Sequence, residues 1–197
     1  MRRCSASNLP SRHRPIVEER CELCALPVAS EHLHLFDRKH RTIVCACDAC
    51  GTLFGLIDVE TYRRIHPSVR RLSHITMDDA SWSSLGVPVG LAFLSRTTSG
   101  EVLAAYPGPA GATMAGVNRD AWNSVVARHP DLQDLEPDVE AWLVNRIAAE
   151  PLQYRVSIDH CYRLAGLVRS RWTGIGGGPP VAEAIAQFFQ ALDGLAA

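Results

Sequence analysis

Two pairs of cysteines, each with two residues between its members, constrain this sequence more than any other feature. The pairs are Cys21 with Cys24 and Cys47 with Cys50, and 22 residues separate them. A C-x2-C turn brings two thiolates to one side of a tight knuckle, and two facing knuckles complete a tetrahedron around a metal ion. Unrelated buried cysteines have no reason to pair twice at this spacing. The pattern therefore predicts one structural zinc site, a zinc ribbon closed by four thiolates.

Other ligand sets are possible in the same segment. Cys45 makes an overlapping C-x-C-x2-C group, and His32 and His34 lie between the two pairs. A site of three cysteines and one histidine is therefore an alternative, although the matching spacing favours four cysteines. His32 and His34 alternate along a predicted strand and share one face. They either support a ligand or lie on the surface, and we interpret them as surface histidines.

Iron is the rival metal. Two C-x2-C pairs also suit the single iron of a rubredoxin or an iron–sulfur cluster. We prefer zinc because nothing else in the chain resembles a site for a redox partner. Gly51 follows the second pair and is expected to supply the permissive backbone conformation of that turn, whereas Ala25 stands at the equivalent place after the first pair.

The chain divides into three segments. Residues 1–18 are polar, rich in arginine and interrupted by proline, which predicts a flexible tail. Residues 19–56 are predicted to form a small zinc-ribbon or rubredoxin-like knuckle module. They are too few to bury a core, so the metal is expected to supply much of their folding free energy, on the order of 10 kcal/mol. Residues 57–197 are expected to form an α+β domain.

Hydrophobic periodicity and turn residues predict the elements of this domain. Strands are expected at 61–65, 69–72, 87–94, 101–106 and 152–156. Helices are expected at 78–85, at 118–129, at 139–147, from Ser157 or Asp159 to Gly174, and after Pro180. The segment 107–116 is rich in glycine and proline and is interpreted as a loop.

Composition excludes several classes of protein. The net charge is −1 and the pI about 6.7, and no basic stripe flanks the cysteines, so nucleic acid and anionic membranes are not expected as partners. The seven cysteines are odd in number and clustered, and the start of the chain lacks the apolar run of a secretory signal. Without an apolar stretch of about 20 residues to span a bilayer, the protein is expected in the cytoplasm.

Motifs of stand-alone enzymes are missing. The sequence has no phosphate-binding or dinucleotide-binding glycine loop, and its glycines at 174–178 follow a helix instead of opening one. Asp159, His160 and Cys161 are neighbours, and neighbours on a helix do not face each other, so Cys161 is interpreted as a core cysteine. We expect no catalytic residues and no enzymatic activity.

Long strings along the chain resemble the family of unknown function 5947 from about residue 19 to 193. The strings are CELC at 21–24, CACDAC at 45–50, DDASWSSL at 78–85, PVGLAF at 88–93, YPGPAGAT at 106–113, LEPDVEAWLVNR at 135–146 and IDHCYRLAGLVRSRWTGIGGG at 158–178. The resemblance implies that the four cysteines are metal ligands and that Cys45 belongs to the same motif. Ala25 departs from the family, whose members tend to have glycine there. The family is encoded beside nickel–iron hydrogenase genes, chiefly in actinobacteria. The resemblance therefore implies a role in hydrogenase maturation or assembly but supplies no mechanism.

Three functions follow as expectations. The first is a metal-binding accessory protein that assists maturation or assembly of a nickel–iron hydrogenase by binding a hydrogenase subunit or an assembly factor. The second is a rubredoxin-like iron protein for electron or metal transfer. The third, least favoured by the charge, is a zinc-ribbon protein that binds nucleic acid.

Overall fold

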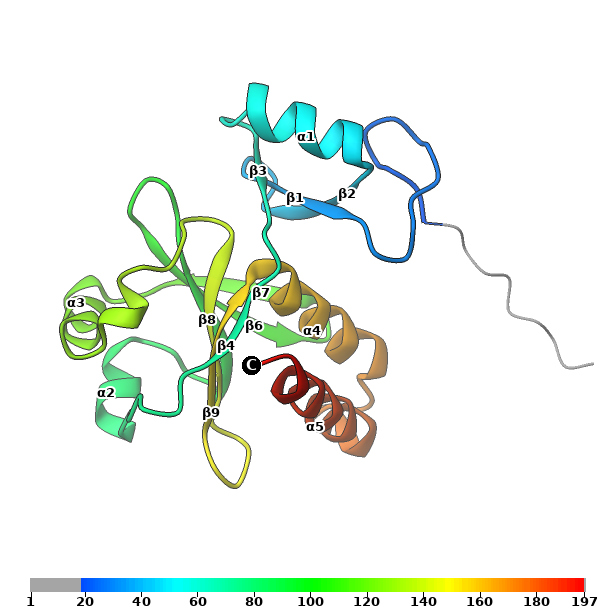
Figure 1. Ribbon diagram of the computed structural model, residues 1–197. Helices are drawn as coiled ribbons and strands as arrows, with labels where there is room; N and C mark the ends of the chain where they lie inside the picture. The colour runs from blue at the N-terminus through cyan, green and yellow to red at the C-terminus, as the bar shows by residue number, and fades with distance from the viewer. Residues whose placement is uncertain (1–18, 197) are drawn as a thin grey trace, which may run out of the picture.

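The computed structural model describes residues 19–196, so the tail predicted at 1–18 lies outside the described residues. Two antiparallel sheets and five α-helices make up this part of the chain (Figure 1). The α+β class predicted from the sequence is confirmed. None of the described helices combines the length and apolar character needed to cross a bilayer.

The small sheet has three strands in the order β2-β1-β3. β1 (Leu33–Asp37) pairs with β2 (Thr42–Ala46) on one side and with β3 (Tyr62–Arg64) on the other. Between β2 and β3 the chain forms helix α1 (Asp48–Ile57), which packs across the sheet (Figure 1). The small sheet therefore continues past residue 56, because β3 supplies its third strand. We call residues 19–64 the N-terminal part and residues 65–196 the body.

The large sheet of the body has six strands in the order β4-β9-β8-β5-β6-β7. Its strands are β4 (Val69–Arg71), β5 (Leu91–Arg96), β6 (Val102–Gly108), β7 (Gly111–Gly116), β8 (Glu140–Asn145) and β9 (Leu152–Ser157). The first of them, β4, pairs with the last, β9, and the Arg71 side chain bonds Asp193 near the end of the chain at 2.7 Å.

Helices cover both faces of the large sheet (Figure 1). Helices α4 (Ile158–Arg171) and α5 (Gly178–Leu195) pack on one face with Phe93 and Tyr154 of the sheet. Helices α2 (Asp79–Ser84) and α3 (Arg119–Arg128) and the short 3-10 helix at Pro130–Leu132 lie on the other, around Trp142. Because the sheet is covered on both sides, the central strands β5 and β8 are buried along nearly their whole length.

Two predicted elements are wrong. Residues 139–147 contain strand β8 instead of a helix, and Ala141 to Val144 are completely buried. Such a strand has a continuous apolar run, which sequence periodicity does not separate from a buried helix. The predicted loop at 107–116 contains the end of β6 and strand β7, joined by a tight turn where Gly111 has a φ of 104°. Pro107 is tolerated because the pairing of β6 with β5 ends at Ala105, so the N–H that proline lacks is not needed for a hydrogen bond to β5.

The N-terminal part rests on the body through apolar and polar contacts, and Ile43 of β2 packs against the same core as Phe36. Phe36 of β1 belongs to the core formed by α4 and α5. Arg38 Nε donates to Oδ2 of the buried Asp138 at 3.1 Å, and Thr98 Oγ1 donates to the same oxygen at 2.6 Å. The hydroxyl of Tyr162 donates to the carbonyl of Arg41 at 2.8 Å. These contacts fix the small sheet above the beginning of α4.

Candidate metal centre

The first cysteine pair lies on a short loop that closes on itself. The backbone N–H of Cys21 donates to the carbonyl of Leu26, and the N–H of Ala25 donates to the carbonyl of Cys21, each at 2.8 Å. Ala25 has a φ of 62°, a left-handed conformation that favours glycine. Glu22 ties this loop to β2, because its N–H donates to the carbonyl of Cys45 and its side chain accepts from the Cys45 N–H at 2.6 Å.

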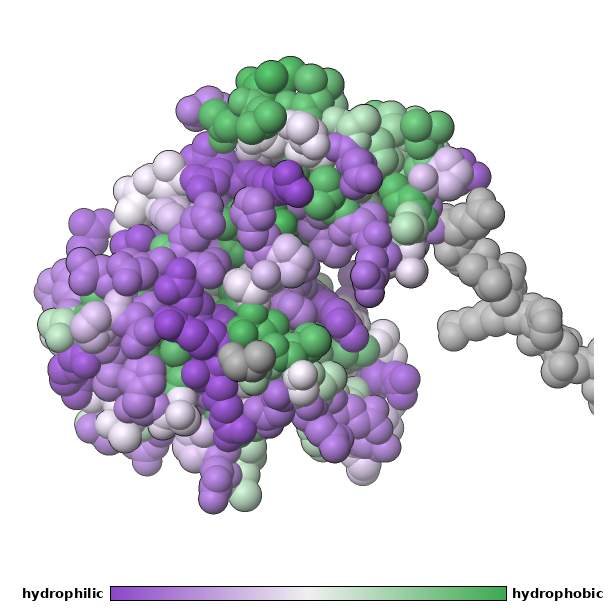
Figure 2. All heavy atoms as spheres, in the orientation of Figure 1, coloured by the Kyte–Doolittle hydropathy of each residue, from purple (hydrophilic) through white to green (hydrophobic). Residues whose placement is uncertain are grey.

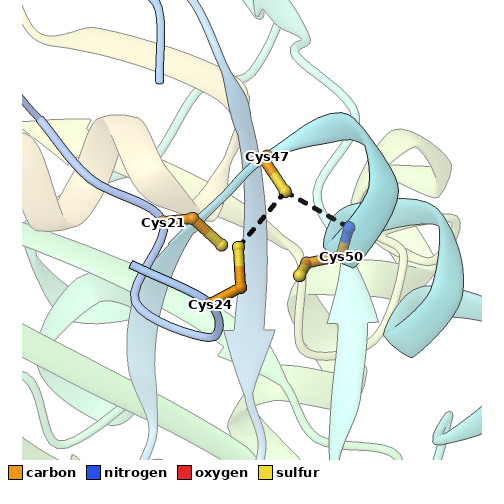
Figure 3. A group of neighbouring side chains, drawn as sticks. All are labelled: Cys21, Cys24, Cys47 and Cys50. Carbon is orange, nitrogen blue, oxygen red and sulfur yellow. Dashed lines mark hydrogen bonds between the residues drawn. The ribbon is translucent and has the colours of Figure 1, made fainter. Parts of the chain in front are cut away.

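The second pair lies at the beginning of a helix and not on the second knuckle that the spacing predicted. Cys47 is the N-cap of α1, and its sulfur accepts a hydrogen bond from the N–H of Cys50 at 3.5 Å (Figure 3). The free N–H groups of a first helical turn and the positive end of its dipole favour negatively charged thiolates. The ribbon architecture is thus not confirmed, although one knuckle and a facing cysteine pair are present.

Gly51 has a different role from the one predicted. It lies within α1 rather than in a left-handed turn, and a Cβ atom there would approach Cδ1 of Leu33 to 2.7 Å. Glycine therefore allows α1 to pack closely on Leu33 of β1, and a larger residue would force the Leu33 side chain to move. The left-handed residue is Ala25, after the first pair.

The four cysteine side chains point toward one another (Figure 3), and their sulfur atoms all lie within 4.8 Å of one another. The sulfurs of Cys24 and Cys47 are 3.7 Å apart. Four thiolates at about 2.3 Å from one zinc ion have edges of about 3.8 Å. The donor set and this spacing fit a tetrahedral metal ion. We call these four residues the four-cysteine cluster.

Electrostatics within the cluster also favour a cation. Burial raises the pKa of Cys21, but the backbone N–H groups of Cys47, Leu23 and Cys24 outweigh it and lower that pKa to about 6. Burial and the neighbouring thiols of Cys24 and Cys47 raise the pKa of Cys50 to about 12. The Cys21 thiol thus ionises readily, whereas ionisation of Cys50 is unfavourable because it would place a second negative charge in the cluster. A bound cation removes that repulsion and stabilises all four thiolates.

Cys45, His32 and His34 do not join the four-cysteine cluster. They form a group of their own, whose potential ligand atoms also lie within 4.8 Å of one another. The side chain of His32 is only 7% exposed, so its interpretation as a surface histidine is wrong. The alternation of His32 and His34 was visible in the sequence, but the position of Cys45 opposite His34 depends on the register of β1 and β2.

Cys161 is completely buried in the core beneath α4, as predicted. Burial raises its pKa well above the usual range, with a smaller contribution from Asp159. Its sulfur is therefore a neutral thiol in an apolar environment, where a nucleophile is not favoured.

Comparison with known proteins agrees with the sequence strings quoted above. The profile of a family described as "Family of unknown function (DUF5947)" matches residues 20–196. Searches of curated proteins and of solved structures found no match. The matched segment includes the whole four-cysteine cluster, both sheets and all five helices. The chain therefore belongs to the family of unknown function DUF5947.

Proposed function

We propose that this protein is a zinc-binding accessory protein of the cytoplasm that acts by binding another protein. The observation that carries the proposal is an apolar surface on α1, the helix that begins at the second cysteine pair. We call this surface the α1 apolar face. It consists of the exposed side chains of Leu53, Leu56 and Ile57 in α1 and of Val59 just after the helix.

The α1 apolar face is unusual for a solvated helix. Leu56 is 72% exposed and Ile57 is 70% exposed, while Gly51 is the only buried residue of α1. Leu53, Leu56 and Ile57 are spaced at i, i+3 and i+4, so they lie together on one side of the helix. Figure 2 shows the resulting apolar patch over α1. Contiguous exposed apolar side chains of this kind mark protein-binding surfaces.

The metal has a structural role in this proposal. Four thiolates fill the tetrahedron around zinc and leave no position for an activated water molecule. Cys47 and Cys50 belong to the first turn of α1, so the ion would hold the beginning of the helix against the loop of Cys21. We therefore propose that the isolated protein has no turnover and that zinc keeps the α1 apolar face in place.

We propose a subunit or an assembly factor of a nickel–iron hydrogenase as the partner, on the basis of the family resemblance. The partner would cover the α1 apolar face with an apolar groove of its own. Binding would assist maturation or assembly of the hydrogenase.

Complementation of a deletion strain tests this proposal. The strain receives the parent gene, Leu56→Glu with Ile57→Glu, Cys21→Ser with Cys24→Ser, or Ile175→Glu as a control for adding charge at another exposed isoleucine. We expect the first two variants to leave hydrogenase subunits immature and the control to restore them. Full hydrogenase activity with both the charged α1 variant and the cysteine variant would refute the proposal.

A rubredoxin-like iron protein is the second candidate. Cys24 is exposed, which gives the cluster an edge that an electron-transfer partner can approach. Ferric iron bound by four thiolates is red and the zinc form is colourless, so elemental analysis of the native protein and its absorption spectrum separate the two. One iron per chain would exclude the zinc proposal and favour electron transfer.

A further inference from the structure

We propose a second metal site, in which His32, His34 and Cys45 bind zinc or a similar divalent transition-metal ion beside the four-cysteine cluster. This site is independent of the proposed function, because it uses none of the four cysteines and none of the residues of the α1 apolar face.

The register of the small sheet brings the three ligands together. His34 of β1 lies directly opposite Cys45 of β2, so their side chains leave the sheet on the same face. His32 precedes His34 by two residues, and the two rings meet edge to face with centroids 4.8 Å apart. One ligand atom from each of the three residues lies within 4.8 Å of the others. Small side-chain rotations would bring all three to one ion at about 2.0–2.3 Å.

The surroundings of His32 leave one ring nitrogen for a metal. Its Nδ1 bonds the carbonyl oxygen of Ala29 at 2.8 Å, an arrangement in which Nδ1 carries the proton and Nε2 keeps its lone pair. Nε2 is buried and finds no hydrogen-bond partner within residues 19–196. A buried acceptor without a partner is uncommon in folded proteins. A metal ion held with His34 and Cys45 would satisfy it.

The surroundings of His34 have the same form. Its Nδ1 lies 3.2 Å from Oδ2 of Asp159, in the first turn of α4. Metal-binding histidines commonly donate their second ring N–H to a carboxylate or a backbone carbonyl, which fixes the tautomer and the ring. His34 has the carboxylate and His32 has the carbonyl. Asp159 belongs to the body, so an ion at this site would also fasten the N-terminal part to the body.

The donor set defines the chemistry of the site. Two imidazoles and one thiolate suit zinc and its neighbours among the divalent transition metals. Three protein ligands leave a fourth position for water or for an outside donor, unlike the closed four-cysteine cluster. Only Ala46 separates Cys45 from Cys47. β2 would therefore supply Cys45 as a ligand of the second site and lead directly into α1, which carries two ligands of the four-cysteine cluster.

Cobalt titration of the full chain tests the second site. Metal-free reduced protein is titrated with Co²⁺, whose absorption reports on thiolate and imidazole ligands. We expect two equivalents per chain. The double variant His32→Ala with His34→Ala is expected to bind one equivalent and to keep the intense four-thiolate spectrum, which also shows that the N-terminal part is folded. His66→Ala, an exposed histidine outside the site, is expected to bind two.

Two further variants make the assignment specific. Cys45→Ala is expected to weaken the second equivalent at least tenfold, and Asp159→Asn, which changes only a positioning residue, 10- to 100-fold. Both variants should leave the first equivalent unchanged. A single equivalent in the parent protein, or a second equivalent that survives in the histidine variant, would overturn the second site without affecting the four-cysteine cluster. If the histidine variant failed to fold, unchanged second-equivalent affinities in Cys45→Ala and Asp159→Asn would overturn it equally.

Discussion

The body and the N-terminal part bury very different amounts of apolar surface. The body has two extensive cores, one on each face of the large sheet, and they contain fully buried aromatic residues such as Trp142 and Tyr154. The core of the small sheet has only Cys21, Leu35 and Ala46 as buried residues. Apolar burial is therefore sufficient for the body, whereas the N-terminal part needs its metal ion and its contacts with α4.

The largest expected effect comes from removing the metal. Cys47→Ser, or chelation of the parent protein, should unfold residues 19–64 and leave the body largely folded, because a structural zinc site contributes on the order of 10 kcal/mol. Hydrogen exchange resolved along the chain measures this directly. Ala49→Ser, at an exposed position of the same helical turn, is the control. Loss of protection in both regions together would mean that they fold as one cooperative unit.

The second test reverses the comparison by damaging the body. Trp142→Ala removes a fully buried side chain from β8 and should lower the free energy of unfolding of the body by about 3–5 kcal/mol. Denaturant unfolding measures the loss, and metal stoichiometry should remain at the parent value. Met114→Ala on the edge strand β7 should change stability far less, since Met114 is exposed. Metal loss in the tryptophan variant would contradict the separation of the two regions.

The third test concerns the junction between them. Arg38→Ala removes the ion-pair partner of Asp138, a buried carboxylate, and should cost about 1–3 kcal/mol because that carboxylate keeps Thr98 as its nearest donor. The rate of backbone amide hydrogen exchange should increase at β1 and at the beginning of α4 together. Lys39→Ala, at the exposed neighbouring position, controls for the loss of one positive charge. A change limited to the N-terminal part would show that the Arg38 contact does not join the two regions.

The smallest effect is expected at Ala25. The substitution Ala25→Gly should stabilise the metal-bound loop by about 1 kcal/mol, because glycine removes the penalty of a left-handed conformation at φ 62°. The apparent zinc affinity should rise about fivefold in a competition titration. Ala29→Gly, between that loop and β1 and without a positive φ, should give no such gain. Equal or weaker affinity of the Ala25 variant would show that the loop does not limit metal binding.

The sequence predicted best where a local signal determines the structure. The cysteine spacing predicted which thiols meet, and Asp78 and Asn118 were correctly placed at the beginnings of helices, because capping residues act on their own neighbours. For α4 the sequence left Ser157 and Asp159 open, and the N-cap is Ser157. The wrong secondary-structure predictions fall where packing between distant parts of the chain determines the conformation. Strand β8 is apolar on both faces because helices from distant parts of the chain cover it.

The site beside the cluster shows the same limit. His32 and His34 share a face by simple alternation, but Cys45 joins them only through the pairing of β1 with β2, and Asp159 through the contact with α4. Gly51 is a similar case, because the close contact that favours glycine there is with Leu33 across the helix–sheet interface. Spacing along the chain carries no information on such partners.

The pairing of β4 with β9 has a consequence for how the chain folds as it is synthesised. β4 begins at Val69, yet it pairs with Val156 and is held by Asp193 near the end of the chain. The small sheet, by contrast, has all its strands once Arg64 has left the ribosome. We therefore expect the N-terminal part to acquire its metal early, while β4 waits as an unpaired strand until β9 (Leu152–Ser157) has been synthesised. Domains folded from such distant contacts close slowly and expose strand edges meanwhile.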